Sequence, residues 1–382
     1  YYWLTGAAYG AMIASKYVPH LLGISLSYYW VFQQLPETRW RLGKKRIITM
    51  FAIMGIVFLI LSPTILLPET WHQMGLFAGS KRVSHDAYEF MGKLYSQRLD
   101  DWLRGIPVYF YVVYTWVKLP FLSVLGFIIG LPLLFRRKLG DGRYFIIFWL
   151  YLWAIAFCFP GGKFTRYYTT VLPAFLITAA LGLQFAGRWL ARAISKLSFG
   201  KPLRHYVPAG LAVIAITWSV VDSVYASPHF RLFTNVLGGG MEQAGAYFPH
   251  DEFYDASMRD TIAEISKSAR PSATVASESP LLASYYAEGQ NRTDLVCVSL
   301  SDPDGLKKLA VGDFVIIARG RRYFSNDALI SSLATTTKPD FQMFLGEVRS
   351  VDVYVLTDAT LKPVQSAMQA RSTAVQTRLL KM

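Results

Sequence analysis

The sequence predicts a multi-span α-helical membrane domain followed by a small extracytoplasmic α/β domain. Hydrophobic residues make up 53% of the 382 residues and charged residues only 17%, a balance that is unusual for a soluble chain of this size. The apolar residues gather in stretches of roughly 17–25 residues, which is the length of a helix that crosses a bilayer. After residue 226 this pattern stops, and apolar residues come in short runs between polar turns.

The membrane domain is expected over residues 1–226, with about six transmembrane helices. We expect the spans at roughly 4–32, 47–67, 119–135, 144–160, 167–187 and 206–226, with a long outer loop at 68–118. The first residue, Tyr1, stands inside an apolar stretch with no charged flank before it. We therefore take the chain to be the carboxy-terminal part of a longer protein.

Positive charge is concentrated in alternate connections between these spans. The connections 35–46, 136–143 and 188–205 together hold fourteen basic and two acidic residues, whereas loop 68–118 and the tail 227–382 are close to neutral. This positive-inside pattern predicts an integral protein of the cytoplasmic membrane whose loop and tail lie on the outer side. It also explains the net charge of +14, so no nucleic-acid partner is expected.

The tail 227–382 alternates predicted helices and strands. Strands are expected at 273–277, 294–299, 313–318, 341–348 and 351–357, and helices at 255–269, 279–288, 303–310 and 326–335. Alternation with continuous apolar strands favours a small, mostly parallel α/β domain that ends in an antiparallel hairpin. Roughly the last twenty residues are polar without clear period and are predicted to form a loose tail.

The outer loop 68–118 is too long for a simple connection. It reads SHDAYEFMGKLY over 84–95 and DDWLRGIPVYFYVVYTWVKLP over 100–120, so aromatic and basic residues are interleaved. Two interpretations stay open: an amphipathic segment on the membrane surface, or a loop packed on its own aromatic side chains. His85, beside Asp86 and Glu89, is either a hydrogen-bonded structural residue or a contact to phosphate or metal.

The short turn 161–168, GGKFTRYY, carries Lys163 and Arg166 and no acidic residue. Its glycines allow backbone N–H groups to approach an anion, and the two cations supply charge on the outer side of the membrane. The turn therefore indicates an anion site, with anchoring to lipid headgroups as the alternative. Lys16 stands inside a predicted span, where a charge is costly and usually faces a cavity or a partner. Arg104 and Tyr167 are the other two residues that we expect at a cavity.

Two motifs in the tail allow more than one interpretation. His250, Asp251, Glu252 and Asp255 stand close together, which suggests either a weak metal site or the start of a helix capped by Asp255 or Ser257. The segment 318–324, ARGRRYF, follows a strand and suggests either a ligand site or, as we favour, a basic face against lipid headgroups. No metal ligands are assigned, although a divalent metal cofactor stays open.

The combined pattern resembles the GT-C membrane glycosyltransferases, closest to the bacterial relatives of the protein O-mannosyltransferases and aminoarabinose transferases. The resemblance rests on SHDAYEFMGKLY and GIPVYFYVVYTWVKLP in the outer loop and on GGKFTRYYTTVLPAFLITAALGL after it. It rests also on LGGGMEQAGAYFPHDEFYDA, TVASES and DFVIIARGRRYFSN in the tail. These segments spread over nearly the whole chain.

The resemblance implies inverting transfer of a hexosyl or pentosyl group from a polyprenyl-phosphate donor to a hydroxyl on a protein, lipid or glycan acceptor. The catalytic carboxylate of the family lies in the first outer loop, which would stand upstream of Tyr1, so the catalytic residue of this chain is unknown. Lys163, Arg166 and His85 are the residues that we expect at the donor phosphate, where cations stabilise the leaving group. Membrane lipids are the other expected partners.

Two other classes of protein stay open. A transporter or flippase of lipid-linked saccharides would also need an outward cavity with cations, and it would show repeat-related spans with broken helices. A non-enzymatic envelope assembly protein would use its outer α/β domain to bind partners and would not need the cationic turn.

Overall fold

The computed structural model describes residues 1–16, 23–24, 26–28, 31, 43–80, 82–140, 142–196, 203–362 and 364. The chain forms two compact units. The first unit comprises Tyr1–Lys81, Leu122–Phe159 and Tyr167–Thr217, and the second comprises Arg82–Phe121, Pro160–Arg166 and Trp218–Met382. Each unit is therefore assembled from segments that are far apart in the sequence.

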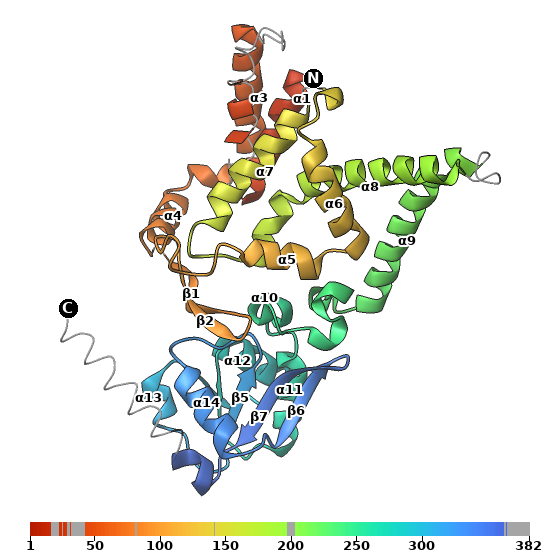
Figure 1. Ribbon diagram of the computed structural model, residues 1–382. Coiled ribbons are helices and arrows are strands. Elements are labelled where there is room, and N and C mark those ends of the chain that lie inside the picture. The colour runs from red at the N-terminus through yellow and green to blue at the C-terminus, as the bar shows by residue number, and fades with distance from the viewer. Residues whose placement is uncertain are drawn as a thin grey trace. The chain divides into compact units, whose positions relative to one another are not determined.

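The first unit is helical (Figure 1). Its helices are α1 (Tyr2–Lys16), α3 (Lys44–Leu61), α4 (Pro68–Ser80), most of α6 (Phe121–Leu133), α7 (Gly142–Cys158), α8 (Leu172–Ile194) and the first half of α9 (Val207–Ala226). Each of the six predicted spans thus contains a helix among the described residues. By length and composition α8 and α9 could cross a membrane, and α6 and α7 are shorter apolar helices. A domain with more spans than these two stays a prediction.

Helices α6 and α8 approach each other through glycines. A Cβ atom on Gly130 would lie 1.9 Å from the carbonyl oxygen of Thr178, and one on Gly182 would lie 1.9 Å from that of Gly126. Small residues at a helix contact allow the two backbones to come this close, as in pairs of transmembrane helices. Any side chain at these positions would push the helices apart.

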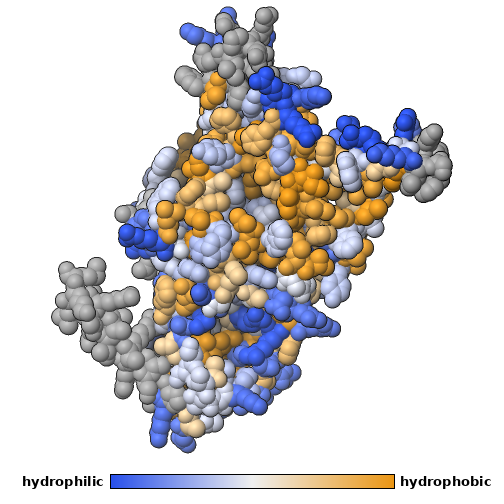
Figure 2. Space-filling view, in the orientation of Figure 1, coloured by the Kyte–Doolittle hydropathy of each residue, from blue (hydrophilic) through white to orange (hydrophobic). Residues whose placement is uncertain are grey.

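Apolar side chains on α9 are largely uncovered within the chain. The exposed fractions of Val213, Ile216 and Val224 lie between 61% and 71%. Figure 2 shows hydrophobic residues gathered over the helices of the first unit and mostly hydrophilic residues over the carboxy-terminal sheet. An exposed apolar surface of this extent indicates contact with another apolar medium.

The second unit begins with a two-stranded hairpin, β1 (Arg82–Phe90) and β2 (Lys93–Arg98). Met91 and Gly92 join the strands, and both have positive φ, 51° and 75°. A two-residue turn with this backbone matches the twist of an antiparallel pair. The short helix α5 (Phe110–Lys118) follows and buries its first aromatic residues.

A five-stranded sheet forms the carboxy-terminal part of this unit, in the order β4-β3-β5-β7-β6. The strands are β3 (Thr274–Ser277), β4 (Val296–Ser299), β5 (Phe314–Ala318), β6 (Phe341–Leu345) and β7 (Val348–Val355). Strand β3 pairs in parallel with β4 and β5, whereas β7 pairs antiparallel with β5 and β6. The predicted α/β fold with a terminal antiparallel hairpin is therefore confirmed, but the sheet is mixed and not mostly parallel, because β7 also pairs antiparallel with β5.

Two apolar cores cover the two faces of this sheet. Helices α11 (Met258–Ser268) and α12 (Pro280–Gly289) pack on one face, where Ile262 and Val275 are fully buried. Helices α13 (Pro303–Leu306) and α14 (Asp327–Thr336) pack on the other, where Leu333 and Val315 are fully buried. The alternation of inward side chains along each strand produces both cores. The predicted loose tail, at 365–382, lies outside the described residues.

Candidate functional site

Four segments of the second unit meet at a buried aromatic cluster. Tyr88 comes from β1, Phe110 from α5, Phe164 from the turn 160–166, and Phe248 from the residue before α10 (Pro249–Phe253). Their ring centroids lie 4.9 Å apart for Phe110 and Phe248 and 5.6 Å apart for Tyr88 and Phe110. All four side chains are at most 1% exposed. Edge-to-face aromatic packing of this kind fixes the segments relative to one another. Residues 82–118 of the predicted outer loop 68–118 thus pack on aromatic side chains, both those of the loop and those of Phe164 and Phe248. An amphipathic segment at the membrane surface stays a prediction.

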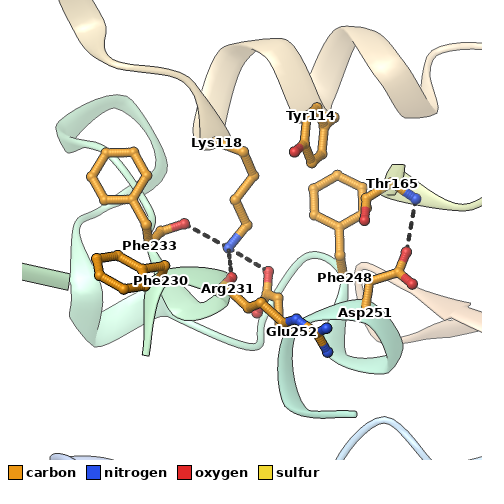
Figure 3. Close-up of a pocket in the computed structure, with 9 residues that line it drawn as sticks. All are labelled: Tyr114, Lys118, Thr165, Phe230, Arg231, Phe233, Phe248, Asp251 and Glu252. Carbon is orange, nitrogen blue, oxygen red and sulfur yellow. Dashed lines mark hydrogen bonds and ion pairs between the residues drawn. The ribbon is translucent and has the colours of Figure 1, made fainter. Parts of the chain in front are cut away.

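Beside this cluster lies a cavity of about 120 Å³ (Figure 3). Helix α5 contributes Tyr114 and Lys118, the turn contributes Thr165, and Asp251 and Glu252 come from α10. The remaining lining residues are Phe230, Arg231, Phe233 and Phe248. Aromatic rings therefore form much of the wall, and two cations and two carboxylates supply its charged groups.

A buried ion pair forms part of the cavity wall. The Nζ atom of Lys118 lies 2.7 Å from Oε1 of Glu252, and the two side chains are 6% and 3% exposed. Lys118 also donates to the carbonyl oxygen of Phe233 at 2.7 Å (Figure 3). Burial raises the pKa of Glu252 and lowers the pKa of Lys118, and each charge opposes the shift of the other.

Asp251 joins the hairpin and the turn to α10. Its Oδ2 atom accepts hydrogen bonds from the hydroxyl of Tyr88 and from the backbone N–H of Thr165, both at 2.8 Å. Burial and the carboxylate of Asp251 raise the pKa of Tyr88, and burial raises the pKa of Tyr114 to about 12. Both phenols therefore stay protonated donors at neutral pH.

Arg231 is the exposed cation of the cavity. Its guanidinium stands over the ring of Tyr254, 5.1 Å from the centroid. Carboxylates that accept from hydroxyl groups, a guanidinium that binds oxyanions and aromatic walls are the components of sites for polyhydroxyl or phosphorylated ligands. The cavity offers all three within a small volume.

The cations predicted at the donor phosphate occupy different environments. Lys163 is fully buried, and its ammonium donates to the carbonyl oxygens of Ile106 and Pro160 at 2.6 and 2.5 Å. Arg166 is exposed, with its guanidinium 4.0 Å from the ring centroid of Phe164. Arg166 is thus open to an outside ligand, while Lys163 holds the turn to the chain before α5. That either binds a phosphate stays a prediction.

His85 lies in a second polar cluster of the same unit. Its ring stacks on Tyr323 at 4.2 Å between centroids and stands 5.8 Å from the ring of His250. Burial, His250 and Arg321 lower the pKa of His85 to about 4, so the ring is neutral at physiological pH. As a phosphate ligand it would donate a hydrogen bond without supplying charge.

None of the three predicted cavity residues is among the described residues that line this cavity. Arg104 is exposed in the second unit, and Tyr167 is half-buried in the first, where its ring is 5.4 Å from that of Phe157. Lys16 ends α1, and its side chain lies outside the described part of the structure. A role for them at a substrate cavity stays a prediction.

The arginines of the segment 318–324 are engaged inside the unit, which corrects the prediction of a basic face for lipid. Arg321 forms an ion pair with Asp255, and Arg322 binds Asp327 at 2.5 Å. Arg319 donates to the carbonyl oxygen of Gly245 at 2.9 Å. The contacts of Arg319 and Arg321 tie the end of β5 to the segment 245–255, and that of Arg322 ties it to the start of α14, so the three cations stabilise the fold.

Of the two predicted alternatives for the residues around His250, the helix start is found, because Ser257 occupies the N-cap position of α11, although its side chain makes no capping hydrogen bond. Asp255 has a positive φ of 63° and receives a hydrogen bond from Ser279. Among the described residues, no group of three or more His, Cys, Asp and Glu side chains is placed to hold a metal ion. Dependence on a divalent metal stays untested.

The most buried polar residues of the cavity were not predicted as a site. Lys118 is the last residue of the predicted outer loop and has no predicted role, and Glu252 belongs to the motif predicted as a weak metal site or a helix start. A charged residue at the end of an aromatic helix, such as Lys118 after FYVVYTWV, was the available signal, because burial of a cation demands a partner. Its partner comes from the distant tail, which the sequence pattern does not indicate.

No family model, no curated protein and no solved structure matches this chain.

Proposed function

We propose that this chain belongs to a membrane glycosyltransferase that moves a sugar from a polyprenyl-phosphate donor to a hydroxyl acceptor on the outer face of the membrane. One observation carries the proposal. The cavity is lined from three of the segments on which the GT-C resemblance rests: GIPVYFYVVYTWVKLP gives Lys118, GGKFTRYY gives Thr165, and AYFPHDEFYDA gives Glu252. Segments that resemble one family at distant points in the sequence thus build one site.

The chemistry of the cavity fits a sugar or its phosphate. Asp251 and Glu252 supply acceptors for hydroxyl groups, Arg231 supplies a fork of donors for a phosphate, and Phe230 and Phe233 supply apolar walls. In the proposed reaction the bond between the anomeric carbon and the phosphate oxygen breaks, and the acceptor oxygen attacks the same carbon from the opposite face. The proton of the acceptor hydroxyl passes to a carboxylate base, as the GT-C resemblance implies. The departing lipid phosphate gains negative charge, which nearby cations stabilise.

Membrane attachment is supported by α8 and α9, which are long and apolar enough to cross a bilayer. A lipid-linked donor has to be met at the membrane surface. The positive-inside charge pattern supports an outer location for the second unit and its cavity, which we adopt as part of the proposal. Arg166 and Arg231 are the exposed cations that we assign to the donor phosphate.

The test uses the protein expressed from its complete gene in membrane vesicles, supplied with polyprenyl-phosphate sugars labelled in the sugar. We expect label to leave the lipid fraction and appear on acceptor molecules. Vesicles in which label crosses the membrane while still attached to the lipid would instead indicate a flippase. The proposal would be overturned if the label stays on the lipid-linked donor, on its original side of the membrane, for both hexosyl and pentosyl donors while the protein is present at its normal level.

Arg231→Gln tests the cavity in the same assay. We expect transfer to fall by about 100-fold, the usual effect of losing one donor to a developing oxyanion. The matched control is Arg259→Gln, because Arg259 is an exposed arginine on α11 in the same unit and lies outside the cavity. Equal activity of both variants would remove Arg231 from the site and leave the transfer reaction itself untouched.

A further inference from the structure

The end of α8 meets the start of α9 in the first unit (Figure 1). A second cavity, of about 600 Å³, is lined by residues from these two helix ends. Arg188 and Arg192 of α8 line it, together with Arg204 and His205 before α9. Phe185 and Pro208 supply an apolar wall. No described residue that lines this cavity is acidic, and the connection 188–205 holds no acidic residue at all.

The backbone brings the arginines together. A Cβ atom on Gly187 would lie 2.9 Å from Cα of Pro208, so the absence of a side chain allows α8 and the start of α9 to approach closely. Arg188 and Arg192 are four residues apart and share one face of α8, where like charges repel each other. Arg204 comes from the other side of the cavity. Because no described lining residue is acidic, an anion that binds between the three arginines would offset their mutual repulsion.

The surroundings indicate which anion. Trp189 and Tyr206 flank the arginines and are 61% and 73% exposed, and exposed Trp and Tyr at helix ends mark the membrane–water interface. Further along α9, Val213 and Ile214 are 61% and 56% exposed and would contact acyl chains. A guanidinium cluster at headgroup level above an apolar helix face fits a phosphate that carries hydrocarbon chains.

We propose that this cavity binds the phosphate of an anionic membrane lipid on the cytoplasmic side. Three guanidinium groups would hold the phosphate oxygens, and the apolar wall and α9 would hold the chains. The inference rests on α8 and α9 lying in a membrane and is independent of sugar transfer. The lipid site differs from the cavity lined by Lys118 and Glu252, because every residue that lines the lipid site belongs to the first unit and that cavity belongs to the second.

The experiment measures lipid binding to the protein, expressed from its complete gene and purified in a non-ionic detergent, by native mass spectrometry. The probes are phosphatidylglycerol, phosphatidylcholine and inorganic phosphate. We expect phosphatidylglycerol to bind in preference to phosphatidylcholine, and inorganic phosphate alone to bind weakly. Each arginine near an anionic lipid contributes roughly fivefold in affinity, so replacement of all three, R188Q/R192Q/R204Q, should weaken binding by about 100-fold.

The control variant K45Q/R137Q/K138Q removes the same charge from exposed residues of the first unit that do not line the cavity. It should retain the wild-type affinity. An equal loss in both triple variants would reduce the effect to general charge attraction and overturn the proposal. Equal binding of phosphatidylglycerol and phosphatidylcholine would also overturn the proposal. Tight binding of inorganic phosphate alone would overturn it too, because the cavity would then be a site for a free anion and not for a lipid. If the triple variant does not fold, the single change R204Q, at an exposed residue, should still weaken binding about fivefold.

Discussion

The ammonium of Lys118 and the carboxylate of Glu252 lie 2.7 Å apart, and both side chains are almost completely buried. The pair connects the end of α5 to α10, so it joins the loop between the predicted second and third spans to the tail. Removal of one partner leaves the other charge buried without compensation. That loss costs far more than the pair itself contributes.

We therefore expect Lys118→Met and Glu252→Met each to destabilise the protein by about 3–5 kcal/mol. The double variant should recover most of this loss, because two apolar side chains of similar volume replace both charges. Thermal denaturation of the detergent-solubilised protein measures the effect. Lys307→Met, which breaks the exposed pair of Lys307 and Asp304, is the control and should leave the midpoint unchanged. A double variant as unstable as either single variant would show that the pair acts through more than its charge.

The α/β sheet could be predicted from the sequence because each strand carries its own local signal. ATVAS at 273–277 and DFVIIA at 313–318 are short apolar runs between polar turns, and both are strands within one residue of the predicted bounds. The final hairpin was likewise visible, since a tight connection joins two apolar runs. Periodicity and turn residues are local properties of the sequence, so strands can be predicted from them without knowing the tertiary contacts.

The candidate cavity could not be predicted because its residues come together only through tertiary packing. Asp251 accepts from Tyr88, and Lys118 meets Glu252, across long separations in the sequence. Composition alone also could not predict the number of membrane spans, since the described apolar helices α6 and α7 are shorter than a helix that crosses a bilayer. In the turn 160–166, charge and glycine predicted an anion site, yet Lys163 is buried against two carbonyl oxygens.

His85 makes the stability of the protein depend on pH. Its pKa falls from the usual 6.5 to about 4, chiefly through burial and then through His250 and Arg321, while Asp255 acts in the opposite direction. As the pH falls, His85 therefore binds a proton at a higher pH in the unfolded chain than in the folded chain. Above about pH 6.5 this residue contributes no pH dependence, and the stability should decline from there down to about pH 4.

His85→Phe should reduce this decline, because a phenyl ring can still stack on Tyr323 but does not titrate. The measurement is the difference in thermal midpoint between about pH 7 and about pH 4.5. Part of the decline should remain, since burial also lowers the pKa of His250. His72→Phe, at an exposed residue of α4, should keep the full wild-type difference. A His85→Phe variant with an unchanged difference would exclude His85 as a source of the pH dependence.

The last prediction concerns Gly161, where the sequence suggests an anion-binding glycine and the structure shows a packing constraint. A Cβ atom at this position would lie 2.6 Å from the carbonyl oxygen of Asp101 and 2.7 Å from that of Arg98. Both are backbone atoms, which cannot rotate away. Gly161→Ala should therefore destabilise the protein by about 1–3 kcal/mol, the range for overpacked sites.

The matched control is Gly75→Ala in α4, where nothing lies within 4 Å of the added Cβ, and there alanine should stabilise the helix by about 0.5–1 kcal/mol. Thermal midpoints of the two variants check both signs. If Gly161 served only to let an anion approach the backbone, Gly161→Ala would keep the wild-type midpoint and lose donor binding. A lower midpoint instead assigns the glycine to the contact between the turn and the segment 98–101, with Arg166 left as the exposed cation of that turn.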